Sequence, residues 1–184
     1  YFYCEVSDMK KAASVFLRGN LCKQDLMHLI RWLQNPQITC YLNEQVTAVY
    51  DLYRLADTVP EPMLGFHLNR YGHFFMICGA GAEAHTIGFV KLAHTASAGE
   101  YEIVYAIGED TLWGQGYGEA AIDKALRIAF SKLGAHSVIA KINPANERSR
   151  RLAAACGFRN VGTSGSMQLY RVGSRRELCT AGSM

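Results

Sequence analysis

Three glycines lie close together in the segment Trp113-Gly114-Gln115-Gly116-Tyr117-Gly118-Glu119, which precedes a strongly helical pattern. The first N–H groups of a helix have no partner within the helix, and the positive end of the helix dipole lies there. Glycine lets such a backbone approach a phosphate without an intervening Cβ. The segment therefore predicts an anion site, although a plain tight turn explains it equally well by itself.

The glycine spacing excludes two common phosphate motifs. A P-loop requires Lys followed by Ser or Thr after the glycines, and neither pair follows here. A dinucleotide fingerprint that starts at Gly114 would need its third glycine where Glu119 stands. It would also need an acidic residue about 20 residues further on, where Val138 and its neighbours are apolar. A dinucleotide site is therefore disfavoured.

Cysteine and histidine do not form a recognisable metal motif. The chain has six residues of each type, without a C-x-x-C, H-x-H or H-x-x-x-H pair. The sequence predicts no metal site. The cysteines are interpreted as free, mostly buried thiols of a cytoplasmic protein in a reducing compartment.

Hydrophobic periodicity predicts the elements that position the turn. Apolar residues at helical spacing predict helices over 25–33, 47–57 and 122–133, and short β-branched or aromatic runs predict strands. The predicted strands cover residues 73–78, 86–92, 101–107, 137–142, 158–161 and 167–172. Asn143-Pro144 is expected to cap and open a further helix that runs to Cys156. This order of elements predicts a mixed α/β (α+β) domain over residues 1–184.

Composition excludes several classes of protein. The chain has 184 residues, 49% of them apolar and 19% charged, with a net charge of +3. This length and apolar content fit one globular domain and exclude intrinsic disorder. A charge of +3 does not support nucleic-acid binding. The longest apolar run, residues 74–82, is too short to span a membrane.

Three ordered blocks resemble the GNAT superfamily of N-acetyltransferases. The glycine-rich turn is similar to its acyl-CoA pyrophosphate loop, [QR]-x-x-G-x-[GA], with Gly116 and Gly118 at the small positions and Trp113 in place of Gln or Arg. Residues 146–158, from the Asn146-to-Ser149 N-x-x-S pattern to Gly157-Phe158, form a second block, and residues 102–107 resemble an E-I-G-Y-W strand. Within the superfamily, these blocks most resemble the branch of ribosomal-protein N-terminal acetyltransferases.

The resemblance implies a mixed, mostly antiparallel sheet that is splayed in the middle and flanked by helices, with acetyl-CoA as co-substrate and no metal. It assigns the pantetheine arm to the strand backbone and the pyrophosphate to the glycine-rich turn. Asn146 is also assigned to the cofactor, with a helix N-cap as the alternative. The assigned cofactor residues are Tyr105, Ala106, Ile107, Gln115, Gly116, Tyr117, Gly118, Glu119 and Asn146.

Attack of an amine on a thioester requires a base, a site for the oxyanion and an acid for the thiolate. The resemblance makes Glu102 the base candidate; the alternative is a solvated strand residue. Many family members place a Tyr shortly before the Gly-Phe pair, but residues 152–156 contain none. The resemblance makes Ser149 the predicted acid, because the similar branch carries Ser at that position. Its alternative is a helix-surface Ser. Cys156 is interpreted as a core residue rather than a nucleophile.

The implied function is direct transfer of an acetyl group to a primary amine, either a protein N-terminal α-amine or a small-molecule amine. One carboxylate favours an amine of low pKa, since an α-amine titrates near ~8 and a Lys side chain near ~10.4. The alternative is a non-catalytic acyl-CoA sensor of the same fold. Neither nucleic acid nor membrane is expected as a partner, and homodimers are common among similar enzymes, although the sequence shows no interface.

Charge is unevenly distributed along the chain. Residues 1–140 contain 11 basic and 14 acidic side chains, whereas residues 141–184 contain 8 and 2. The hypothesis is that the basic end, including Arg150 and Arg151, holds the polyanionic CoA. Acidic residues would receive a cationic amine: Glu100, Glu102, Glu109 and Asp110.

Overall fold

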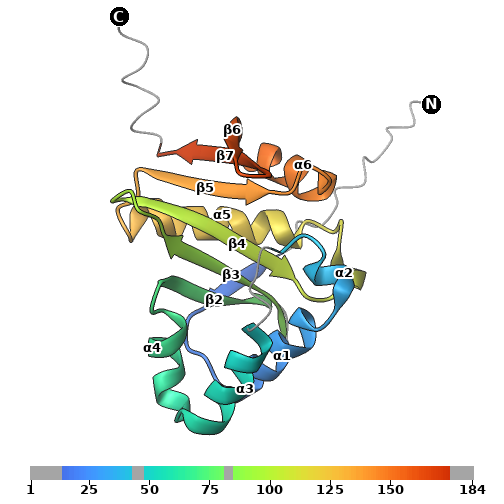
Figure 1. Cartoon of the computed structure of the whole chain (residues 1–184), viewed down its shortest axis with the longest axis vertical. Coiled ribbons are helices and arrows are strands. Elements are labelled where there is room, and N and C mark those ends of the chain that lie inside the picture. The colour runs from blue at the N-terminus through green and yellow to red at the C-terminus, as the bar shows by residue number, and fades with distance from the viewer. Residues whose placement is uncertain (1–13, 43–47, 81–84, 175–184) are drawn as a thin grey trace, which may run out of the picture.

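The computed structural model describes residues 14–42, 48–80 and 85–174. Its centre is a seven-stranded sheet with the strand order β1-β2-β3-β4-β5-β7-β6 (Figure 1). The strands are β1 (Val15–Arg18), β2 (Gly72–Gly79), β3 (Thr86–His94), β4 (Glu100–Ile107), β5 (Ser137–Ile142), β6 (Arg159–Ser164) and β7 (Met167–Gly173). Every neighbouring pair is antiparallel except β4 and β5. The predicted α+β fold with a mixed, mostly antiparallel sheet is confirmed.

The parallel pair is where the sheet opens. β4 and β5 pair only over Glu100–Glu102 and Ser137–Ile139, and Glu102 opposite Ile139 is the last rung. β4 continues for five more residues to Ile107. The carboxyl halves of the two strands therefore diverge, which is the splay that the sequence resemblance implies.

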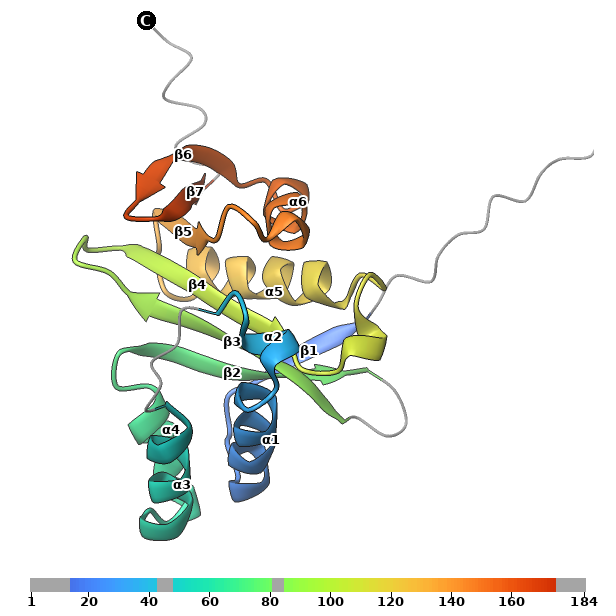
Figure 2. The same ribbon diagram turned by 45° about the vertical axis from the view of Figure 1, so that its right-hand side comes forward.

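Helices cover both faces of the sheet (Figure 2). α1 (Lys23–Leu33), α2 (Pro36–Thr39), α3 (Ala48–Thr58) and α4 (Leu64–Leu68) contribute to a core on one face. α5 (Tyr117–Ser131) and α6 (Glu147–Ala155) contribute to a core on the other. Two 3₁₀ turns, η1 (Glu61–Met63) and η2 (Asp110–Leu112), complete the elements of the described part. None of the helices described has the length and apolar character needed to cross a bilayer.

Alternation along β4 directs its side chains into both cores. Ile103, Tyr105 and Ile107 pack on the face of α5 and α6, whereas Val104 and Ala106 pack on the face of α1. A strand points successive side chains to opposite faces, so residues of even number share a face. One strand therefore presents different side chains to the two sides of the splay.

Most predicted elements are present, with shifted ends. The helix expected over 25–33 begins at Lys23. The helix expected over 47–57 corresponds to α3, and its expected first residue, 47, lies outside the described residues. The four-residue strand β1, and α2 and α4, were not predicted. β1 lies beside β2, with Phe16 opposite Cys78.

The prediction that Asn143-Pro144 opens the last long helix was wrong. The side chain of Asn143 instead accepts a hydrogen bond from the backbone N–H of Ala145, at 2.9 Å, and forms a turn. Asn146 is the N-cap: its Oδ1 accepts from the N–H of Ser149 at 3.0 Å. The helix starts three residues later because the second Asn caps it.

Candidate functional site

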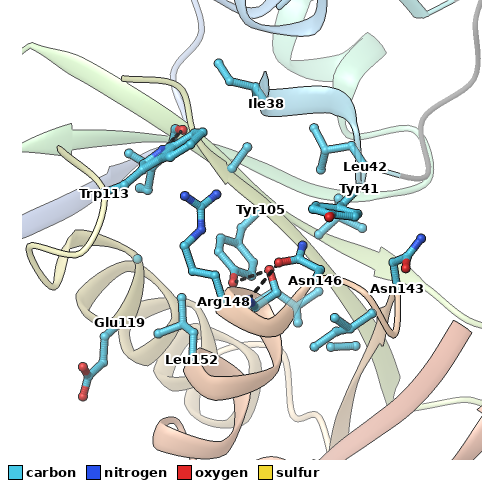
Figure 3. A pocket seen from close by; sticks show the side chains of 18 of the residues that line it. Ile38, Tyr41, Leu42, Tyr105, Trp113, Glu119, Asn143, Asn146, Arg148 and Leu152 are labelled. Carbon is cyan, nitrogen blue, oxygen red and sulfur yellow. Dashed lines mark hydrogen bonds between the residues drawn. The ribbon is translucent and has the colours of Figure 1, made fainter. Parts of the chain in front are cut away.

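A cavity of about 350 Å³ lies where β4 and β5 separate. Its wall includes every residue of β4 from Glu102 to Ile107, together with residues of β5, α2 and the N-terminal ends of α5 and α6. Figure 3 shows Tyr105, Asn146 and Arg148 on the side of α6, facing Ile38, Tyr41 and Leu42 across the space. The splay is therefore an open site with a polar wall and an apolar wall.

Nine of the eleven predicted site residues line this cavity. They are Glu102, Tyr105, Ala106, Ile107, Gly116, Gly118, Glu119, Asn146 and Ser149. Gln115 and Tyr117 do not. The side chain of Gln115 donates to the carbonyl of Thr111, and Tyr117 packs against the core of the α5 face.

The glycine-rich turn leaves the N-terminus of α5 open. Gly114 and Gly116 have φ angles of +75° and +88°, the left-handed region that glycine adopts without a Cβ penalty. Gly116 is the N-cap and provides no side-chain hydrogen bond to the helix. The N–H groups of the first turn are therefore available to an anion.

Gly118 has a different role from the other two glycines. A Cβ at this position would lie 2.9 Å from Cδ2 of Leu152 and 3.9 Å from Cε2 of Tyr105. The missing side chain lets α5 approach α6 and β4 closely. In this one motif, two glycines are needed for their backbone conformation and the third for close packing.

Arg148 and Trp113 form a stacked pair at the cavity. The guanidinium carbon of Arg148 lies 3.7 Å from the centre of the Trp113 ring, and the indole Nε1 donates to the carbonyl of Ile107 at 2.9 Å (Figure 3). Trp113 occupies the position where the family pattern has Gln or Arg. A positive charge reaches this position from α6 instead, and sequence reasoning missed it because the two residues are 35 positions apart.

Glu102 lines the cavity with its carboxylate already paired. Nζ of Lys141 on β5 donates to Oε2 of Glu102 at 2.7 Å, and both side chains are partly buried. Lys141 also lines the cavity. Glu102, the base candidate, therefore lines the cavity, but its carboxylate is already ion-paired with Lys141.

Ser149 is held on both sides. Its backbone N–H is bonded to the Asn146 cap, and its Oγ lies 3.4 Å from the hydroxyl of Tyr105, which donates to it (Figure 3). Burial raises the pKa of Tyr105 above that of a free phenol, against the lowering effect of the bond to Ser149. Tyr105 was predicted to contribute only backbone contacts, so the sequence did not reveal the role of its side chain.

The charged groups of the hypothesis do not gather in the cavity. Glu100 pairs with Arg171 and accepts from Ser137, and Glu109 pairs with Arg31. Neither carboxylate lines the cavity, and Asp110 does not either. Of the basic end, Arg150 and Arg151 are outside the lining residues, whereas Arg148 and Lys141 are among them.

Nucleophilic and metal chemistry find no support in the described residues. Cys22, Cys40, Cys78 and Cys156 are free, and none lines the cavity. Burial, with Glu119 and Asp123 nearby, raises the pKa of Cys156 to about 11. The described ranges contain no group of three or more side chains that could hold a metal.

A family model of the acetyltransferase (GNAT) domain matches residues 15–159. No curated protein matches the sequence significantly.

Solved structures share the fold. A domain from Methanocaldococcus jannaschii aligns with a TM-score of 0.71 at 20% identity, and the alignment covers 88% of this chain and 99% of that domain. An aminoglycoside acetyltransferase in complex with coenzyme A has 0.68 at 17%, covering 92% and 100%. Spermidine N-acetyltransferase from Vibrio cholerae, in complex with CoA and spermine, has 0.67 at 21%, covering 85% and 92%. At these identities the structures show the fold alone. They do not single out the ribosomal-protein branch.

Proposed function

The chain belongs to the GNAT acetyltransferase family, and we propose that it transfers an acetyl group from acetyl-CoA directly to a primary amine. The observation that supports this most is the position of the two candidate groups. Glu102 and Ser149 line one cavity at the splay, where β4 and β5 have lost their pairing. A thioester lying there would have a carboxylate and a hydroxyl available at once.

The donor is proposed to enter along β4. The backbone of Tyr105, Ala106 and Ile107 would bond the pantetheine arm, and the first turn of α5, from Gly116 to Glu119, would receive the pyrophosphate. The open N-terminus supports this assignment, because its N–H groups have no side-chain cap. Arg148, stacked on Trp113, adds a positive charge on the same wall.

The acceptor is proposed to approach from the opposite face of β4. Glu102 shares a face with Val104 and Ala106, next to the apolar wall of Ile38 and Leu42. As the base, it would take the proton of the attacking amine directly or through a water, after its bond to Lys141 loosens. Backbone N–H groups near Val104 and Ala106 would stabilise the oxyanion.

The leaving thiolate is proposed to take a proton from Ser149. The carbon–sulfur bond breaks as the tetrahedral intermediate collapses, and the amide and free CoA remain. Direct transfer is favoured over an acetyl-cysteine intermediate. A thiol with a pKa of about 11 holds very little thiolate at neutral pH, and Cys156 does not line the cavity.

The acceptor wall favours an amine beside an apolar group. This wall is formed by Ile38, Tyr41 and Leu42. Among the described residues that line the cavity, Glu102 is the carboxylate on the same face of β4 as this wall. A polycation would gain more from several carboxylates. We therefore favour a protein N-terminal α-amine or a small monoamine as acceptor.

The alternative function is a non-catalytic acyl-CoA sensor. The pairing of Glu102 with Lys141 favours it, since a base that is already engaged by a cation is less available. The absence of Tyr from residues 152–156 favours it as well.

A turnover screen separates the two. The protein is incubated with acetyl-CoA and a panel of peptides, amino acids, polyamines and aminoglycosides, and free CoA thiol is measured over time. The expected result is amine-dependent thiol release with the peptides or monoamines. Tight binding of CoA by calorimetry, with no acetylated product for any amine by mass spectrometry, would identify a sensor instead.

A further inference from the structure

We infer that Tyr105 is a positioning residue that supplies the proton that Ser149 passes to the leaving thiolate. This inference rests on the proposed acetyl transfer. The earlier assignment of Tyr105 to the donor uses only its backbone, so its side chain has no assigned function.

The geometry links the two hydroxyls across the site. Tyr105 projects from β4 toward α6, where its hydroxyl donates to Oγ of Ser149 at 3.4 Å. This distance is long for an O–H···O bond, and catalytic hydrogen bonds commonly shorten when substrates bind. The residues are 44 positions apart, so the contact depends on the packing of α6 against the sheet.

Two further contacts hold the pair in place. The Asn146 cap fixes the backbone of Ser149 through the bond from its N–H. The partly buried ring of Tyr105 packs against the core of the α5 and α6 face, and a Cβ on Gly118 would lie in van der Waals contact with Cε2 of the ring, at 3.9 Å. The ring therefore packs close to the backbone of Gly118.

The chemistry of the groups explains why such a pair is useful. A serine hydroxyl has one proton and two lone pairs, and the phenol occupies a lone pair, which leaves the serine proton for the cavity. An aliphatic alkoxide is a poor product, whereas a phenolate is a much weaker base and is the better final acceptor of the negative charge. Burial keeps the pKa of Tyr105 above the free value, so the phenol stays protonated through the neutral range.

The proposed step is balanced. As the carbon–sulfur bond breaks, its electron pair goes to sulfur, and the thiolate takes the proton of Ser149. Ser149 takes the proton of Tyr105 in the same event. The phenolate regains a proton from water after the products leave.

The positions of base and acid on β4 agree with this step. Glu102 and Tyr105 are three residues apart and therefore project from opposite faces of the strand. Val104 and Ala106 pack on one face, and Tyr105 on the other. An amine would thus lose its proton on one side of the thioester while the thiolate gains one on the other.

The test compares Tyr105→Phe with the wild type, after the amine screen has found an acceptor. Turnover is expected to fall about 10- to 100-fold while the dissociation constant of CoA stays within about 2-fold. The matched control is Tyr170→Phe, because the hydroxyl of this buried Tyr bonds to Gln168 at 2.9 Å outside the cavity. The control should keep the wild-type rate.

Two readouts separate a proton relay from a structural role. In the Ser149→Ala background, Tyr105→Phe should change the rate less than about 2-fold, since the relay is already broken. In mixtures of H₂O and D₂O, the wild-type rate should fall along a curve, which indicates two protons in flight, and Tyr105→Phe should give a straight line.

Several outcomes would overturn the inference. A Tyr105→Phe protein with the full rate, effects of the two variants that multiply, or an unchanged solvent profile would remove Tyr105 from the proton path and leave acetyl transfer intact. A wild type that acetylates no amine would overturn the proposed function, and the relay with it.

Discussion

Glu102 and Lys141 bridge the two strands at the point where the strands separate. Nζ of Lys141 lies 2.7 Å from Oε2 of Glu102; Glu102 belongs to the last β4–β5 pair, and Lys141 lies two residues beyond its partner Ile139. The carboxylate is thereby held at the edge of the cavity, where an incoming amine would compete with Lys141 for it. As the proposed base, Glu102 is fixed in position but already ion-paired.

Glu102→Gln is expected to lower kcat about 100-fold or more, because the amide cannot take a proton from the amine. The affinity for CoA should remain unchanged, because the assigned donor contacts are those of backbone and Arg148. Steady-state thiol release and calorimetry measure the two quantities. Glu109→Gln is the control, since Glu109 pairs with Arg31 outside the cavity. A Glu102→Gln protein that turns over at the rate of this control would exclude Glu102 as the base.

Arg148→Met is expected to weaken CoA binding about 5- to 20-fold, because a charge-assisted contact to phosphate contributes about 1–2 kcal/mol. The variant should also bind CoA with less dependence on salt, since one cation fewer faces the anion. Titration calorimetry at two salt concentrations tests both. Arg151→Met is the matched control, because Arg151 pairs with Glu147 on the exposed side of α6. Equal losses for the two variants would show that general charge, not the position over Trp113, holds the donor.

Cys156 is expected to react slowly with thiol reagents at neutral pH. A raised pKa means that the thiolate is the minor form until the pH approaches that value of about 11, so its share at pH 7 is roughly 1 in 10⁴. Peptide-resolved mass spectrometry with iodoacetamide should label the exposed Cys40 well before Cys156. Labelling should speed up as the pH rises. Cys156→Ala should retain turnover within about 2-fold; a trapped acetyl-Cys156 would contradict direct transfer.

Gly108→Ala is expected to lower the free energy of unfolding by about 2–3 kcal/mol. A Cβ there would lie 2.1 Å from Cε2 of Trp32, whose ring is 1% exposed and has no room to move. Gly65→Ala is the control: it is a helical glycine whose Cβ would meet no atom within 4 Å, and it should be neutral or slightly stabilising. Urea denaturation measures both. Equal stability of the two variants would show that α1 is less tightly packed against the end of β4.

The strands β2 and β4 were predicted well from the sequence, because their apolar and aromatic runs are long and have glycine at both ends. Sequence reasoning missed β1 and α4, which have four and five residues, because so few residues show no clear periodicity. It misplaced the start of α6 because two Asn residues were both able to cap it. Which Asn caps the helix depends on which side-chain amide reaches a free backbone N–H of its first turn. Local geometry decides this, not the residue type.

Nine of the predicted site residues line one cavity, and the roles assigned to them stay predictions. The three motif blocks form much of that cavity, because the backbone is continuous within each block. The partners of its side chains lie 39 positions away for Glu102 and 44 for Tyr105. Such pairs depend on strand register and helix packing, and neither is encoded within a short motif. Arg148 was missed for the same reason, although it lies inside the block that was recognised.

The three rungs between β4 and β5 have a mechanical consequence. β1–β4 form one half of the sheet and β5–β7 the other, and backbone pairing joins the halves only over residues 100–102 and 137–139. A ligand that bonds to both strands beyond Glu102 would supply the missing rungs and tie the halves together. By linkage, the free energy with which such a donor binds would then appear as an equal gain in the stability of the contact between the two halves of the sheet.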